Sequence, residues 1–211
     1  MNRRFSSHLF WGSHSPFSAL SGGALMIMAS TRLAFALICA GALIWVYALT
    51  ALIYSSARPI LPAKGRLVIL LFLCTFFCGL YAILTSLLNP LLIMGTCFFL
   101  FLIPPWCLGS GFFESSDSED PSEAVSRALL EAITLAVIII ALALIREPLG
   151  MGTISIPGGV QGILEIFGSH GNDTFVPARI LSVSSGGLLL LGYGTALYRY
   201  LRENNASGLE D

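Results

Sequence analysis

Residues 67–113 read LVILLFLCTFFCGLYAILTSLLNPLLIMGTCFFLFLIPPWCLGSGFF and contain no charged side chain. A helix rises 1.5 Å per residue, so about 20 apolar residues cross the roughly 30 Å hydrocarbon core of a bilayer. The run is therefore long enough for two membrane spans. Asn89 and Pro90 divide it, because Asn favours turns and Pro disfavours a helical conformation of the preceding residue.

The composition of the whole chain agrees with a membrane protein. Hydrophobic residues make up 55% and charged residues 11% of its 211 residues, and its mean hydropathy is +0.83. Soluble domains carry about 25% charged residues. The formal net charge of −1 offers no basic surface for nucleic acid, so we expect no nucleic-acid partner. The intervals between charges place six helices, near residues 17–31, 33–55, 67–88, 91–109, 124–145 and 180–199.

The distribution of Lys and Arg predicts the orientation of these helices, because cytoplasmic loops carry an excess of both. With a cytoplasmic N-terminus, the outer segments hold Arg32, Arg146 and Arg179. The inner segments then hold Arg3, Arg4, Arg58, Lys64, Arg66, Arg127, Arg199 and Arg202. This bias predicts a multi-pass protein with both termini in the cytoplasm.

The predicted organisation is a cytoplasmic segment 1–15, a six-helix membrane domain 16–200 and a cytoplasmic tail 201–211. The domain has an acidic cytoplasmic loop, 114–123, and a long outer loop, 147–178. In the outer loop, Pro157, Gly158 and Gly159 predict a turn. An apolar face beside this turn suits the membrane surface or a partner; it consists of Val160, Ile163, Leu164, Ile166 and Phe167.

The first and fourth predicted helices are defective. Residues 17–31 are too short for a full span and contain Gly22 and Gly23. The fourth helix meets Pro104 and Pro105, which remove backbone donors. Interrupted segments at matching positions of two halves indicate an inverted-repeat membrane fold. We therefore predict an all-α fold of two inverted three-helix repeats, with two coincidentally irregular helices as the alternative.

Few side chains in the sequence are candidates for catalysis or for ion binding. His8, His14 and His170 fall outside the predicted helices, and Glu131 is the ionisable group inside one. An intramembrane carboxylate suits ion handling, but Arg127, four residues earlier, offers a local partner. No catalytic residue is identified, and whether the chain is an enzyme stays open.

The cysteines are interpreted differently from one another. Cys74 and Cys78 share a helical face, and we interpret them as packing residues because no further ligands complete a metal site. Cys107 follows the two prolines, where we expect irregular backbone. Such a thiol is free to point into a central cavity and is a candidate ligand.

The chain resembles the RnfE/NqrD family, membrane subunits of Rnf and Na⁺-translocating NADH:quinone reductase complexes. Residues 145–154, IREPLGMGTI, look like the Arg-Glu-x-x-Gly-x-Gly-Thr-Leu motif of that family, matching at Arg146, Glu147, Gly150, Gly152 and Thr153. Three weaker likenesses follow the family's order along the chain: 15–31, Cys107 to Glu114, and Ser184 to Ala196.

The resemblance implies a subunit of an ion-translocating electron transport complex in the bacterial cytoplasmic (inner) membrane. It contributes to the transmembrane electron path and to ion coupling, beside a homologous six-helix sister subunit and other subunits, in the lipid bilayer. The family's two broken helices supply cysteines to a [2Fe–2S] cluster shared with the sister subunit. Here Cys107 matches the second cysteine, whereas Leu25 stands at the first and cannot bind iron. A cluster with an outside ligand and a subunit without the cluster both stay open.

Two other functions fit the same pattern. Broken helices and inverted repeats equally suit a small membrane permease or a substrate-binding transporter component. A structural assembly subunit without redox or transport residues is the other alternative.

Overall fold

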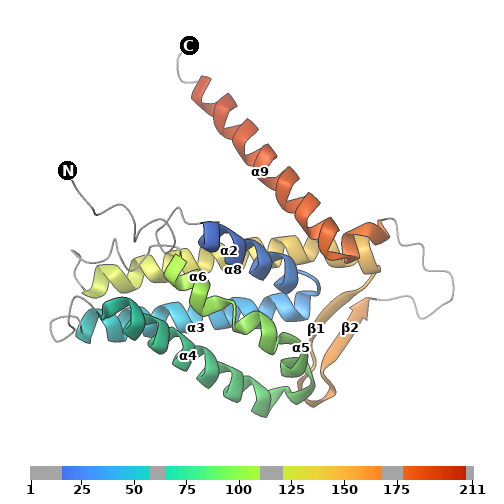
Figure 1. Cartoon of the computed structure of the whole chain (residues 1–211). Coiled ribbons are helices and arrows are strands. Elements are labelled where there is room, and N and C mark those ends of the chain that lie inside the picture. The colour runs from blue at the N-terminus through green and yellow to red at the C-terminus, as the bar shows by residue number, and fades with distance from the viewer. Residues whose placement is uncertain (1–15, 58–64, 110–120, 168–177, 208–211) are drawn as a thin grey trace.

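The computed structural model of the chain describes residues 16–57, 65–109, 121–167 and 178–207. Figure 1 shows a bundle of helices, a small hairpin across one end and a last helix that projects away. The helices are α2 (Pro16–Ala29), α3 (Leu33–Ala57), α4 (Arg66–Leu88), α5 (Pro90–Leu100), α6 (Ile103–Gly109), α8 (Pro121–Met151) and α9 (Ser184–Ser207). Two short 3₁₀ helices, η3 (Gly159–Gln161) and η4 (Arg179–Ser182), lie in the connections.

Helices α3 and α8 form the centre of the bundle and make the most extensive contact between described elements. Small side chains allow their backbones to approach closely, as is usual between membrane helices. On α8, as far as Ala143, the almost fully buried residues recur every three or four positions and are alanine with one exception, Ile139: Ala124, Ala128, Ala132, Ala136, Ile139 and Ala143. Apolar residues thus line both faces of α8, one packed on α3 and the other exposed.

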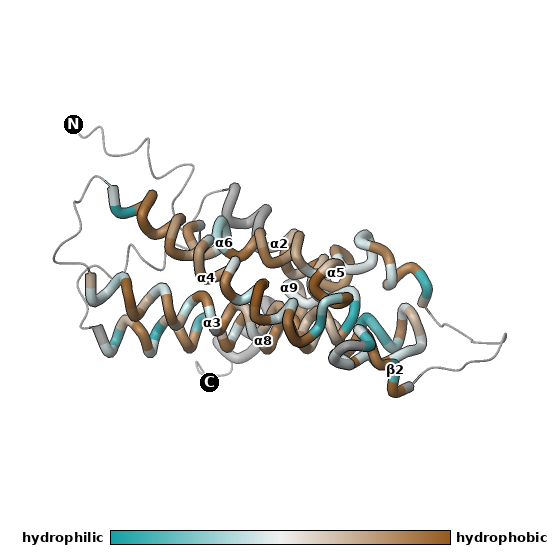
Figure 2. The backbone as a smooth tube through the Cα atoms, turned by 90° about the horizontal axis from the view of Figure 1, so that it is seen from below, coloured by the Kyte–Doolittle hydropathy of each residue, from teal (hydrophilic) through white to brown (hydrophobic). Residues whose placement is uncertain are grey.

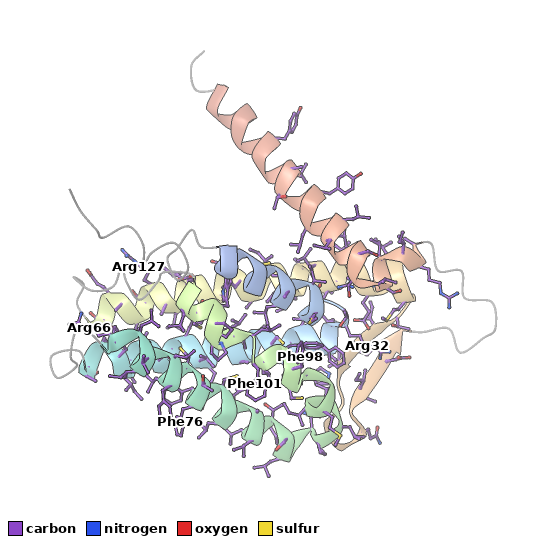
Figure 3. All side chains as sticks on the ribbon, in the orientation of Figure 1. Arg32, Arg66, Phe76, Phe98, Phe101 and Arg127 are labelled. Carbon is purple, nitrogen blue, oxygen red and sulfur yellow. The ribbon has the colours of Figure 1, made fainter. Side chains whose placement is uncertain are left out.

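Helices α4 and α5 meet at the predicted turn. Helix α4 ends at Leu88, and Pro90 occupies the first turn of α5, where its missing N–H is not needed. The outward face of this pair is apolar: Phe76, Phe98 and Phe101 are all more than half exposed (Figure 3). Figure 2 shows hydrophobic residues through the middle of the bundle and hydrophilic residues toward its ends.

The fourth predicted helix is indeed interrupted, but not in the way we expected. The break falls at Phe101 and Leu102, before the two prolines. Pro104 and Pro105 then lie in the first turn of α6, where proline is tolerated. The backbone around Cys107 is consequently helical, and the expectation of irregular backbone there is wrong.

Within the described residues, four segments are long and apolar enough to cross a membrane. They are Leu33–Ala57, Arg66–Leu88, Pro90–Leu108 and Ser122–Met151. Helix α2, with 14 residues, is as short as predicted. Helix α9 is long but does not belong to this set of four, so the structure supports a multi-pass helical protein without establishing six spans.

The connection between α8 and α9 departs furthest from the prediction. Helix α8 continues through Pro148 to Met151, well past the expected end at residue 145. An antiparallel hairpin follows, formed by β1 (Ile154–Pro157) and β2 (Ile163–Phe167), so the fold is mostly rather than entirely helical. The predicted turn at Pro157–Gly159 lies at its tip, where Gly159 and Gly162 have left-handed φ values of 64° and 82°.

Candidate functional site

The Arg146 side chain is the largest fully buried side chain in the described structure, 1% exposed, near the end of α8. Its guanidinium has five N–H groups, and the structure supplies five acceptors. Nε donates to the carbonyl of Leu181 (2.6 Å), and Nη2 donates to those of Ser182 (3.3 Å) and Val183 (2.9 Å). Nη1 donates to the carbonyl of Ile27 (2.5 Å) and to Ser30 Oγ (3.2 Å).

These acceptors explain how a buried cation is tolerated. A buried charge is costly unless hydrogen bonds satisfy it. The carbonyl of Ile27 belongs to the last turn of α2, and those of Leu181 to Val183 lie at the end of η4. Carbonyls in a last helical turn lack intrahelical donors and carry partial negative charge. Arg146 therefore joins the C-terminal ends of two helices far apart in the sequence.

Glu147 binds the N-terminal end of a helix, whereas Arg146 binds C-terminal ends. Its carboxylate is 1% exposed, and Oε2 accepts a 2.6 Å hydrogen bond from the backbone N–H of Leu33, the first residue of α3. Oε1 accepts from Thr153 Oγ1 at 3.4 Å. The first N–H groups of a helix need acceptors, and the helix dipole favours negative charge there. Adjacent residues of α8 thus bind helix ends of opposite polarity.

Glycine is required at the two glycine positions of the motif for different structural reasons. A Cβ on Gly150 would lie 2.7 Å from the backbone nitrogen of Ser182, so η4 packs directly on the α8 backbone. Gly152 follows the last residue of α8 with φ of 68°, and its N–H bonds the carbonyl of Pro148 at 3.0 Å. This left-handed residue ends the helix, and glycine adopts it at least cost. Every motif residue thus helps to form one joint, here called the helix-end joint: Arg146, Glu147, Gly150, Gly152 and Thr153.

The start of α9 completes the helix-end joint. A Cβ on Gly187 would lie 3.0 Å from Arg146 Nη1 and 3.2 Å from Ile27 Cγ2. Gly186 lies as tightly against the backbone of Ile180 and Leu181. The glycines of the predicted sixth-helix opening therefore let α9 begin against the guanidinium and α2.

Helix α2, which is short but continuous through Gly22 and Gly23 and so is not broken as predicted, meets the interrupted α5–α6 segment within the bundle. The ring of Trp106 on α6 packs so closely on Gly22 of α2 that no Cβ could fit at residue 22. Leu25 and Cys107 both belong to the central apolar cluster, with 2% and 0% of their side chains exposed. The two positions that the resemblance pairs therefore lie on helices that contact each other, and Ile27 and Ser30 place the helix-end joint toward the C-terminal end of α2.

The residues at this junction do not fit a cluster held by the pair of positions 25 and 107. Leu25 offers no ligand, and the Cys107 thiol is directed into this chain's own core, within hydrogen-bonding reach of the Cys74 thiol and the Tyr47 hydroxyl. In the part of the chain that the structure describes, no three His, Cys, Asp or Glu side chains gather as a metal site.

The other candidates are placed as follows. Cys74 and Cys78 are both buried; the Cys74 thiol lies 3.7 Å from Thr50 Oγ1, and Cys78 Sγ lies 3.0 Å from the carbonyl of Leu100. Glu131 is half-buried on α8, close enough to Cys107 to act on it electrostatically. The three histidines lie outside the described residues.

Sequence reasoning missed the partners of the helix-end joint. Ser30 and Ser155 take part through hydroxyl groups, the latter accepting from the N–H of Ala34 at 3.3 Å. The remaining partners are backbone groups, which leave no signature in the residue types. Serine is a common residue, so its presence at these positions did not indicate a role. The only sequence signal was that both serines lie close to the ends of helices.

Comparison with known protein families gives a match that covers most of the chain. The family model described as "Rnf-Nqr subunit, membrane protein" matches residues 7–193, which include the whole helix-end joint, the short helix α2 and the interrupted α5–α6 segment. The comparison with curated proteins gives no match. The match covers most of the chain, and the chain therefore belongs to the Rnf-Nqr family of membrane subunits.

Proposed function

We propose that the chain contributes to the transmembrane electron path and to ion coupling in an Rnf/Nqr-type complex. One observation carries the proposal: Arg146 of the family-like motif holds the C-terminal end of the short helix α2, which packs on α6 beside the interruption of the bundle, and Glu147 holds the start of α3. Irregular backbone at membrane depth occurs where it is buried in protein or lines a cavity, and in inverted-repeat proteins it marks the working site. The joint would hold that site in register with α3 and α8.

We further propose that the fold consists of two inverted repeats, α2–α3–α4 and α5/α6–α8–α9. Three features support this pairing. The first members, α2 and α6, contact each other; the second members, α3 and α8, form the centre; and each first member is short or interrupted. The third members differ, because α4 packs on the bundle whereas α9 projects from it (Figure 1).

The functional test uses everted membrane vesicles from a strain that lacks the chain. Electron-donor oxidation should drive ion uptake in the parent strain and in the strain complemented with the wild-type chain, but not in the deletion strain. Complementation with Arg146→Met should fail to restore uptake, whereas Arg127→Met at the far end of α8 should restore it. Redox-driven uptake that survives the deletion, together with loss of uptake of a solute, would instead support the permease.

We propose that a transmembrane helix of the homologous sister subunit packs against the projecting helix α9. Residues 192–197 of α9 are exposed on every side. A groove of about 530 Å³ separates α9 from α8 and is lined by Thr134, Ile138, Leu142, Leu190, Leu191, Gly194 and Thr195. Its small and hydroxyl-bearing residues suit close helix–helix contact within a membrane, more than contact with lipid.

Photo-crosslinking in the assembled complex tests this contact. A photoreactive amino acid at Thr195 should give an adduct with another subunit, and mass spectrometry should identify the crosslinked helix. The control position is Val68 on α4, 67% exposed and on a lipid-facing span. Lipid adducts alone at both positions would refute the assignment.

The proposed location is the bacterial inner membrane, with both termini in the cytoplasm. Arg66 and Arg127 lie at one end of the bundle and Arg32 at the other (Figure 3), which supports the predicted orientation. Reporter fusions after Lys64 should report the cytoplasm, and fusions at Gly159 should report the outside. A cytoplasmic signal at Gly159 would overturn this orientation.

For the cofactor, we propose that no iron–sulfur cluster is held through positions 25 and 107. The support is the buried Leu25 side chain and the inward direction of the Cys107 thiol. The chain's contribution to the electron path would then be indirect, because it would position the neighbouring subunits that carry the electrons, and it would also position the ion route.

A further inference from the structure

The β1–β2 hairpin has two unlike faces. Because side chains alternate along a strand, the pairing of Ser155 with Glu165 and of Ile156 with Leu164 puts these two pairs on opposite faces. The face that bears Ser155 and Glu165, here called the polar face although Ile163 also lies on it, is turned toward the protein: Ser155 is fully buried and bonded to the N-terminal turn of α3. On the same face, Glu165 Oε1 lies 3.5 Å from Arg32 Nη1.

The opposite face is apolar and exposed. Ile156, Leu164 and Ile166 are 38%, 47% and 57% exposed. A hairpin at the surface of a soluble protein has the reverse arrangement, with its apolar face on the core. In water this arrangement would be unfavourable by about 25 cal/mol for each Å² of apolar surface. The outward face therefore indicates an apolar medium around the hairpin.

The place of the hairpin identifies that medium. The turn lies against the start of α5, where a Cβ on Gly162 would come within 3.2 Å of Leu91 Cβ. Ile163 packs inward beside Leu92. Around this contact the α4–α5 turn presents outward apolar side chains that are 61–79% exposed: Leu87, Leu88, Leu91 and Met94. These belong to two membrane spans, so the hairpin face continues a lipid-facing surface.

We propose that the apolar face of this hairpin, Ile156, Leu164 and Ile166, lies in the boundary between lipid headgroups and acyl chains. The depth follows from the backbone. A two-stranded sheet has edges with unpaired N–H and C=O groups, which the hydrocarbon interior does not satisfy. The boundary region offers water and headgroups to these edges and accepts apolar side chains to a depth of about 5–10 Å.

This placement has a consequence for the helix-end joint. Ser155 bonds Ala34 and Glu147 bonds Leu33, so the hairpin and the joint hold the same turn of α3. A hairpin anchored in the lipid boundary would fix the depth of α3 and of the joint in the bilayer. The inference does not depend on the proposed electron-transfer role.

Site-specific fluorescence in the full chain tests the proposal. In a Cys97→Ser background, which removes the exposed native thiol, Leu164→Cys and Ile166→Cys are labelled with an environment-sensitive fluorophore in phospholipid nanodiscs. Glu165→Cys, between them on the polar face, is the matched control; its exposed ion pair contributes about 0–1 kcal/mol, so the hairpin should persist. The unsubstituted background reports labelling of the four buried cysteines.

Labels at 164 and 166 should emit at shorter wavelength than the label at 165. Nitroxide lipids labelled near the headgroup should quench them about twofold more than lipids labelled deep in the acyl chain, as expected for the boundary region. Water-like emission with equal iodide quenching at all three positions would overturn the proposal. Loss of lipid quenching at 164 when the other subunits are present would also overturn it, because a protein partner would then cover the face.

Discussion

Replacement of Arg146 by methionine should destabilise the chain by a calculable amount. The change keeps a long side chain but removes all five donors. Ile27 keeps a bond from Ser30 Oγ and Val183 one from the N–H of Gly186, whereas Leu181 and Ser182 have no other donor among the described contacts. A fully buried acceptor left without a partner costs about 1–3 kcal/mol, which is an upper bound here because both of these carbonyls are only partly buried.

Two such carbonyls give about 2–6 kcal/mol. Removal of the buried charge returns part of its desolvation cost, so we expect the lower half, about 2–4 kcal/mol. At about 2–4 °C for each kcal/mol in a chain of this size, the melting temperature should fall by about 4–16 °C. Arg146→Lys should fall between wild type and Arg146→Met, because an ammonium has three donors and no planar fork.

A thiol-reactive fluorogenic dye provides the assay. In the Cys97→Ser background the four remaining cysteines are buried, so the dye reports opening of the core on heating in detergent. Arg127→Met, at an exposed position on the same helix, is the matched control and should shift melting by about 1 kcal/mol or less. An Arg146→Met protein that melts within about 2 °C of wild type would refute the reasoning, given the range above.

Three further predictions use the same protein. Glu147→Gln keeps an acceptor for the Leu33 N–H and should lower the free energy of unfolding by about 0.3–1 kcal/mol, whereas Glu147→Ala should lower it by about 1–3 kcal/mol. Equal melting temperatures of wild type and Glu147→Gln would contradict the role of the charge at the start of α3. Gly150→Ala should lower the melting temperature more than Gly152→Ala, because a Cβ at 150 meets backbone whereas a Cβ at 152 meets open space and only the strain of about 1–2 kcal/mol for a left-handed residue; Gly79→Ala, in open space, is the control, and the reverse order would count against the assigned contacts. Cys107→Ser should leave the iron content of the purified complex unchanged, and elemental analysis showing loss of stoichiometric iron would show that Cys107 binds a cluster.

The membrane helices were predictable because their signals are local. Charges and the Asn89–Pro90 pair mark where apolar runs end, and α3, α4 and α5 begin or end close to those marks. The end of α8 was misplaced for a physical reason. Arg146 and Glu147 looked like a solvated boundary, but the tertiary structure satisfies both charges internally and the helix continues past them.

The hairpin and the joint depend on information that the local sequence does not contain. Strands of four and five residues within a glycine-rich connection give a weak alternation, and their polar face is explained by Arg32 and Ala34 more than 120 residues earlier. The motif could be located from its residue types. Its role could not, because its acceptors are carbonyls whose positions depend on the whole fold.

The Arg146 contacts also impose an order in time on the formation of the molecule. The carbonyl of Ile27 and the guanidinium that binds it are 119 residues apart. At synthesis rates of about 5–20 residues per second, α2 is made roughly 6–24 s before Arg146 exists. The Leu181, Ser182 and Val183 carbonyls are made later still. The end of α2 is therefore fixed only late in synthesis, and a nascent chain released before residue 146 has no guanidinium to hold it.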